Sequence, residues 1–246
     1  MKLKKAAIAG VLSFSAVLAV GAPVFADTDG TMNSKSFIKF EQNTNPVDPT
    51  NPINPGEVVD PTTDPSNPDD THEQGTQGPL SIDYVSNFNF EEQKASGNNE
   101  VYYASLDTVT RKGTKEKLEV PNYVQVTDNR GTNVGWKLTV KQNHQFKTVD
   151  DAELTGAALT LKNGTLSSAS GSNAPKAEQN ITLTPGQSSD VVTAEAEQGM
   201  GTWANAFGKT ADEGKKSIEL SVPGKTKKNQ TQYTTSLTWE LKDTPM

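Results

Sequence analysis

The C-terminal stretch at residues 232–245 reads Q-Y-T-T-S-L-T-W-E-L-K-D-T-P and shows the clearest apolar alternation in the chain. Successive side chains of a strand point to opposite faces, so residues two apart share a face. The larger side chains at this spacing are Tyr233, Thr235, Leu237, Trp239 and Leu241. The pattern predicts a half-buried strand over residues 232–242. Asp243 and Pro245 end it, because a turn former and a residue without an N–H donor interrupt a strand ladder.

A second alternation lies upstream, in V-G-W-K-L-T-V-K at residues 134–141, with Val134, Trp136, Leu138 and Val140 on one face. Both strands contain Trp-x-Leu, a tripeptide that identifies nothing by itself. The longer C-terminal spacing Y-x-x-x-L-T-W-E-L-x-x-x-P, together with W-K-L, resembles the two signature motifs of the WxL domain of Gram-positive cell-surface proteins. The resemblance covers roughly residues 80–246.

This resemblance implies that the two motifs lie near each other and support non-covalent attachment to the Gram-positive cell wall, with peptidoglycan as the ligand. The residues that it assigns to the binding motif are Trp136, Leu138, Tyr233, Leu237, Trp239 and Leu241. It also implies membrane-anchored companion proteins and other WxL proteins as partners.

The residues themselves leave open whether the motifs form a surface or a core, because a large aromatic on an apolar strand face is most often core. We interpret the motifs as holding two strands in one sheet or in facing sheets. On this interpretation wall binding depends on them mainly through the integrity of the domain.

Strand-like segments separated by turn signals continue from residue 80 to the C-terminus. They cover residues 80–84, 101–109, 123–127, 134–141, 158–162, 181–184, 190–197, 217–222 and 232–242. No window keeps a helical period, so we predict an all-β fold, a β-sandwich of Ig-like or Greek-key type, with a barrel as the next architecture. Asn163-Gly164 predicts a type I′ hairpin turn.

Two stretches, residues 166–179 and 198–216, are rich in Gly, Ser and Asn and are predicted to be loops. The second contains Trp203 and Phe207, which are unusual in a solvated loop. They either pin the loop onto the domain or form a ligand-facing aromatic pair, accessory to the binding motif.

Residues 1–26 have the pattern of a secretory signal peptide. Lys2, Lys4 and Lys5 precede an apolar run that is short for a membrane span, and Val24-Phe25-Ala26 resembles an A-x-A cleavage site. We expect export, cleavage after Ala26 and a mature protein that does not span the membrane.

Residues 27–79 are rich in Pro, Asn and Asp and hold ten acidic residues against two lysines. Pro46, Pro49, Pro52 and Pro55 recur at the period of polyproline II, and the segment has few apolar side chains to bury. We predict a disordered, extended spacer in front of one folded domain at residues 80–246. The sequence has no Cys, so this domain must be stabilised by its core, and no apolar tail follows the last strand, which predicts non-covalent attachment.

Composition argues against an enzyme and against a nucleic-acid partner. The chain has 23 Lys and Arg against 30 Asp and Glu, a net charge of -7, whereas nucleic acid requires a basic stripe. With two histidines, His72 and His144, and no Cys, a zinc or iron site is not expected. Asp150, Asp151 and Glu153 form the tightest acidic cluster, which we interpret as a solvated turn. No nucleophile, phosphate-loop or dinucleotide motif is present, so we predict no enzyme, no cofactor and no metal.

We therefore expect a secreted protein at the cell surface that binds peptidoglycan or an associated wall polymer. Two other classes stay open. One is a structural subunit of a multiprotein surface complex that binds a membrane-anchored companion through edge strands. The other is a wall hydrolase, which the missing acid–base set disfavours.

Overall fold

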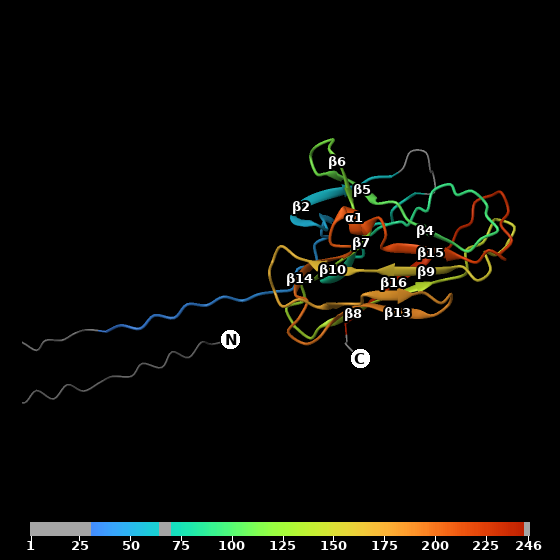
Figure 1. Cartoon of the computed structure of the whole chain (residues 1–246). Coiled ribbons are helices and arrows are strands. Elements are labelled where there is room, and N and C mark those ends of the chain that lie inside the picture. The colour runs from blue at the N-terminus through green and yellow to red at the C-terminus, as the bar shows by residue number, and fades with distance from the viewer. Residues whose placement is uncertain (1–30, 64–69, 244–246) are drawn as a thin grey trace, which may run out of the picture. The chain divides into compact units, whose positions relative to one another are not determined.

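A computed structural model of the chain describes residues 31–63 and 70–243 (Figure 1). The predicted signal peptide, including Ala26, lies outside the described residues. The chain divides into two units, Met1–Lys39 and Phe40–Met246. In the first unit, residues 31–39 are exposed and form neither helix nor strand. All the strands described below belong to the second unit, which is called the folded unit here.

In the described residues the folded unit has sixteen strands, which form four four-stranded sheets with antiparallel pairing, and one short helix, α1 (Ala211–Gly214). One sheet has the order β1 (Thr50–Asn51), β2 (Asn54–Pro61), β5 (Asp107–Arg111), β6 (Lys117–Val120). Another has the order β10 (Gly164–Ser167), β14 (Gly201–Phe207), β7 (Tyr123–Asp128), β3 (Leu80–Val85). A third has the order β11 (Lys176–Ala177), β13 (Ser188–Ala194), β8 (Trp136–Gln142), β16 (Leu237–Lys242). The last has the order β12 (Asn180–Thr182), β9 (Ala158–Lys162), β15 (Ile218–Val222), β4 (Glu100–Tyr103). The prediction of an all-β sandwich is confirmed.

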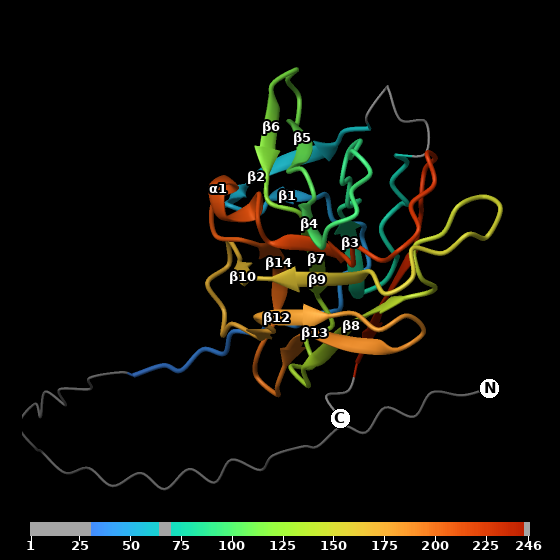
Figure 2. The same cartoon turned by 45° about the vertical axis from the view of Figure 1, so that its right-hand side comes forward.

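The β10-β14-β7-β3 sheet separates two apolar clusters. The main core is the larger cluster, built by buried side chains of β7, β8, β9, β13, β14 and β15. The second core consists of Val59, Tyr84, Val109, Val120, Tyr123, Ala204 and Ala206. In Figure 1 and Figure 2, β2, β5 and β6 lie above β7, and β8 and β13 lie below it.

Side chains along β7 and β14 alternate between the two cores. Val124 and Val126 belong to the main core, whereas Tyr123 belongs to the second. On β14, Trp203 packs in the main core and its neighbour Ala204 in the second. Because a strand directs successive side chains to opposite faces, both strands are buried along nearly their whole length.

The predicted spacer is wrong at residues 50–61. β1 and β2 pair with each other, and β2 continues the ladder to β5. Val59 is fully buried in the second core. Thr50 donates from its backbone N–H and its hydroxyl to Oε1 of Gln125, at 2.8 and 2.9 Å. The folded unit therefore begins well before residue 80.

The prolines of this segment are compatible with a strand as well as with an extended spacer. Proline fixes φ in a range that polyproline II and extended strands share, so its recurrence does not separate the two. Burial here also depends on a polar residue: Gln125 has no exposed surface, and its Nε2 donates to the Asp48 carbonyl and to Oδ2 of Asp83, both at 3.0 Å. A buried amide is not visible in a hydrophobic pattern.

The predicted type I′ hairpin at Asn163-Gly164 is also wrong. β9 ends at Lys162 and β10 begins at Gly164, but the two strands belong to different sheets. Asn163 has a φ of 58°, but a type I′ turn needs positive φ at both central residues, and Gly164 is not among the residues with positive φ. Glycine is needed at position 164 because the backbone there passes close to that of Glu178. An added Cβ would lie 2.4 Å from the carbonyl oxygen of Glu178.

The predicted loop at residues 198–216 contains β14, an inner strand between β10 and β7. Ala204 and Ala206, within the stretch predicted to be a loop, belong to the second core together with Tyr84 and Tyr123. The other predicted loop, residues 166–179, holds the end of β10 and the two-residue β11. The single strand predicted at residues 101–109 is two strands, β4 and β5, in different sheets.

Removing the chain before residue 80 is expected to destabilise the fold, whereas removing it before residue 40 is not. The shorter product loses Val59 and leaves Gln125 without Thr50 and Asp48. Burying one Val contributes about 1.5–3 kcal/mol, and a buried unsatisfied polar group costs about 1–3 kcal/mol, so we expect a loss of about 3 kcal/mol or more. Urea unfolding of the two products measures this difference, and equal stability would contradict the role given to β1 and β2.

Candidate functional site

The two Trp-x-Leu motifs lie on neighbouring strands of one sheet. β8 pairs with β16 so that Leu138 is opposite Leu241 and Val140 is opposite Trp239. β8 also pairs with β13, while β16 pairs only with β8 among the described residues and forms the outer strand. The structure thus brings the two motifs side by side, with their apolar residues on the inner face of the sheet.

The first motif is part of the main core. Trp136 is 1% exposed and Leu138 is fully buried. Val134, which the alternation placed on the same face, precedes β8 and is 47% exposed. The inner position of Trp136 and Leu138 means that neither side chain is available to touch a wall polymer in this conformation.

The second motif is half-buried. Leu237, Trp239 and Leu241 pack against the main core, and the residues between them are exposed, as the alternation predicts. The strand is shorter than predicted, since it begins at Leu237 and only Thr234 bridges to Lys147 before it. Tyr233 also packs against the main core, and its hydroxyl accepts a hydrogen bond from the backbone N–H of Asn229 at 2.7 Å.

Two indole groups hold the segment that leads into β14. Nε1 of Trp136 donates to the carbonyl of Gly199 at 3.0 Å, and Nε1 of Trp203 donates to the carbonyl of Met200 at 3.1 Å. Gly199 has a φ of 74°, and an added Cβ would lie 2.6 Å from Nε1 of Trp136. The first motif therefore fixes a loop as well as filling the core.

Trp203 and Phe207 are core residues of β14. They are 6% and 1% exposed, and the ring of Phe207 packs edge-on against Phe88 at a centroid distance of 6.3 Å. A ligand-facing aromatic pair does not fit this burial. The signal that could have placed them is the alternation Trp203, Asn205, Phe207, which small residues obscured.

The acidic cluster lies on an exposed turn. Asp150, Asp151 and Glu153 are exposed, and Asp151 forms an ion pair with Lys147, with Oδ1 and Nζ 2.5 Å apart. The hydrogen bond and charge of Lys147 lower the pKa of Asp151. In the part of the chain that the structure describes, no group of three or more acidic or His side chains is arranged to hold a metal ion.

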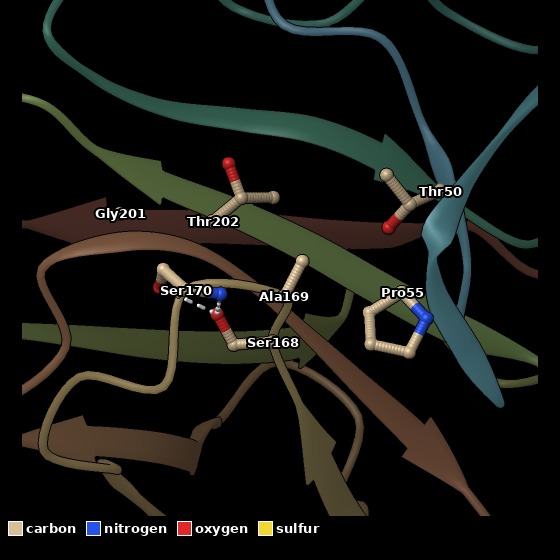
Figure 3. A pocket seen from close by; sticks show the side chains of 7 residues that line it. All are labelled: Thr50, Pro55, Ser168, Ala169, Ser170, Gly201 and Thr202. Atoms are coloured by element: carbon tan, nitrogen blue, oxygen red, sulfur yellow. Dashed lines mark hydrogen bonds between the residues drawn. The ribbon is translucent and has the colours of Figure 1, made fainter.

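A hollow of about 320 Å³ lies where β1 and β2 meet the end of β10 and the start of β14 (Figure 3). Its lining is Thr50, Pro55, Ser168, Ala169, Ser170, Gly201 and Thr202. Ser168 and Ser170 hydrogen-bond to each other at 2.9 Å. None of the lining side chains is ionisable, so the hollow offers hydroxyl groups for hydrogen bonding but no acid–base pair.

A second hollow of about 210 Å³ is polar and includes Asp70, His72 and Asp107 in its lining. Asp107 is 8% exposed, and its Oδ2 accepts from the hydroxyls of Tyr84 at 2.7 Å and Ser86 at 2.5 Å. Burial raises the pKa of Asp107 despite these hydrogen bonds. The sequence pattern did not indicate this site, because Asp107 begins β5, and the single strand predicted at residues 101–109 does not separate β5 from β4.

The described residues thus form an all-β unit in which one four-stranded sheet carries both motifs on neighbouring strands. The WxL family model, described as "WxL domain surface cell wall-binding", matches residues 27–245, and the chain belongs to this family. This family is one of cell-wall-binding domains at the cell surface, not of enzymes, which places the chain at the wall. No curated protein and no solved structure matches. Within the described residues, no helix is long and apolar enough to cross a membrane.

Replacing Trp136 is expected to cost more stability than replacing Trp239. Trp136→Ala removes a fully buried ring, for which transfer and cavity effects together cost about 3–5 kcal/mol. Trp239→Ala removes a half-buried ring from an outer strand and is expected to cost about half as much. Urea unfolding of both variants in a Trp203→Phe background measures the difference. Equal losses, or no loss at Trp136, would contradict the core role of the first motif.

The unfolding free energy is expected to depend on pH through Asp107. Because its folded-state pKa is raised, the folded state holds this proton more tightly than the unfolded chain. The resulting stabilisation is present at acidic pH and is lost as pH rises through the folded-state pKa. Asp107→Asn keeps an oxygen acceptor for Tyr84 and Ser86 without the charge, so its stability relative to wild type should improve from about pH 4 to about pH 7.

Urea unfolding at the two pH values measures this effect. Asp150→Asn, which removes an exposed carboxylate, is the matched control for the loss of one negative charge. A relative stability of Asp107→Asn that stays constant with pH would show that burial of this carboxyl has no energetic consequence.

Proposed function

We propose that this chain attaches non-covalently to the Gram-positive cell wall through its folded unit, with peptidoglycan or a polymer linked to it as the ligand. The observation that carries the proposal is the match of the WxL family model across residues 27–245. The buried position of Trp136 and Leu138 supports a particular role for the motifs. The motif residues hold β8 and β16 together. Wall binding depends on these residues because the sheet that they stabilise is needed for binding.

Retention on protein-free wall sacculi tests this proposal. The purified protein should sediment with sacculi that carry no protein, because the proposed ligand is the wall itself. An unrelated β-sandwich protein of similar net charge is the control for trapping. Retention on intact cells alone would contradict the proposal.

A second candidate is attachment to a membrane-anchored companion protein. The observation that favours it is β16, an outer strand whose inner residues Leu237, Trp239 and Leu241 are only half-buried. An added strand from a partner would extend the sheet and cover these side chains. Binding to intact cells that is lost after proteolysis of surface proteins, with no retention on sacculi, supports this candidate instead.

A further inference from the structure

The residues that alternate with the two motifs face away from the main core. Directly paired residues of an antiparallel sheet share a face, so Lys137 and Lys141 of β8 lie on the outer face with Thr238 and Lys242 of β16. β13 adds Thr193 opposite Lys137, and β11 adds Lys176 opposite Thr193. We call the surface defined by Lys137, Lys141, Lys176 and Lys242 the lysine face.

Three of these lysines form a row across the four strands. Lys176, Lys137 and Lys242 lie at one level of the ladder, with Thr193 between the first two. Neighbouring strands are roughly 4.8 Å apart, so the row extends over about 14 Å. Lys141 lies four residues along β8 from Lys137, a distance of about 13 Å. The cations are thus spread over a patch and do not converge on one point.

The charge of this face is opposite to that of the chain. The lysine face carries Asp190, paired with Lys137 at 3.0 Å, and Glu240, paired with Lys242 at 3.2 Å. Lys141 and Lys176 form no ion pair with any described residue. Glu178 continues the ladder of β11 two residues after Lys176 and shares its face, since its N–H donates to the Val191 carbonyl. Four lysines and three carboxylates leave an excess of one positive charge on this face, whereas the chain has a net charge of -7.

Two lysines stand directly opposite each other in this arrangement. Lys137 and Lys242 are paired positions on β8 and β16, and like charges at such positions destabilise a strand pair. A carboxylate beside each lysine reduces this repulsion. A polyanion laid across the strands would neutralise both lysines and the two unpaired ones as well.

The shape of the face restricts the kind of ligand. On these strands the outer residues are Lys, Thr, Ser, Asp and Glu, with no aromatic ring for stacking on a sugar. Neither of the hollows described above is lined by a residue of this face. A discrete sugar or peptide is usually held in a concave site, whereas a linear polymer with repeated charges needs only spaced cations. Lys binds phosphate groups as a point charge.

We propose that the lysine face binds the phosphodiester groups of an anionic glycopolymer attached to the peptidoglycan. This inference rests on the proposed wall attachment and names the ligand class and the surface. The motif residues orient the face from inside. Lys141, Lys176 and Lys242 make the contact, because the side chain of Lys137 is only 16% exposed. Binding of this kind weakens with salt, because mobile ions screen exposed charges.

The test uses the full folded chain and two preparations of sacculi, one with its anionic polymers and one from which hydrofluoric acid has cleaved the phosphodiesters. At low salt, the double variant Lys141→Gln/Lys176→Gln should bind the first preparation roughly ten- to thirtyfold more weakly than wild type, since each lysine near an anionic surface contributes a factor of about five. Wild type should bind the stripped preparation weakly.

Lys225→Gln/Lys227→Gln is the matched control. Both residues are exposed, form no ion pair with a described residue and lie outside the four strands of this sheet, so this variant should bind like wild type. Melting temperatures of all variants should stay close to that of wild type, which separates loss of contact from loss of fold.

The outcomes distinguish the two proposals. Failure of wild type to bind either preparation overturns wall attachment itself. Equal binding of wild type to both preparations overturns the phosphodiester ligand and points to the peptidoglycan. The third outcome concerns the variants. If Lys141→Gln/Lys176→Gln binds as well as wild type, or loses no more binding than the control variant does, the lysine face is not the binding surface.

Discussion

The fold depends on a sheet that must be covered on both faces. The side chains of β7 and β14 alternate between the side of the main core and the side of the second core, and nearly all of them, polar ones such as Gln125 included, are buried, so neither strand has a solvent face. Leaving either side bare would expose buried rings such as Trp203 on one side or Tyr123 on the other. This requirement explains why β1 and β2, from a segment rich in proline, belong to the folded unit: β2 supplies Val59 to the second core.

The WxL motifs serve the main core from the opposite side. Trp136 fills this core and also donates a hydrogen bond to Gly199, which fixes the approach to β14. Trp239 covers the rim of the same core from the outer strand. Side chains alternate along a strand, so every residue between the motif positions faces away from the core. A motif of buried residues thereby determines which side chains the sheet presents outward.

Much of the fold could be predicted where one face of a strand is apolar. The alternation at Leu237, Trp239 and Leu241 appears in the structure as alternating burial, and β9 has the predicted bounds. Prediction failed where burial is two-sided or polar. Ala204 and Ala206 are small because they face a second core, and Gln125 is buried through hydrogen bonds. Neither arrangement produces a hydrophobic pattern. The lysines of the outer sheet were visible in sequence, but their alignment depends on strand pairing that the sequence does not give.

The docking of β1 and β2 has a mechanical meaning for a protein held at a surface. A force applied through the N-terminal segment reaches the folded unit first at residues 40–61, where the chain is attached by the Thr50 and Asp48 hydrogen bonds to Gln125 and by the short β2–β5 ladder. The strands that carry the two motifs, β8 and β16, lie in another sheet. Load applied there would therefore separate β1 and β2 from the folded unit before it strains β8 and β16, so the sheet that carries the two motifs would keep its register.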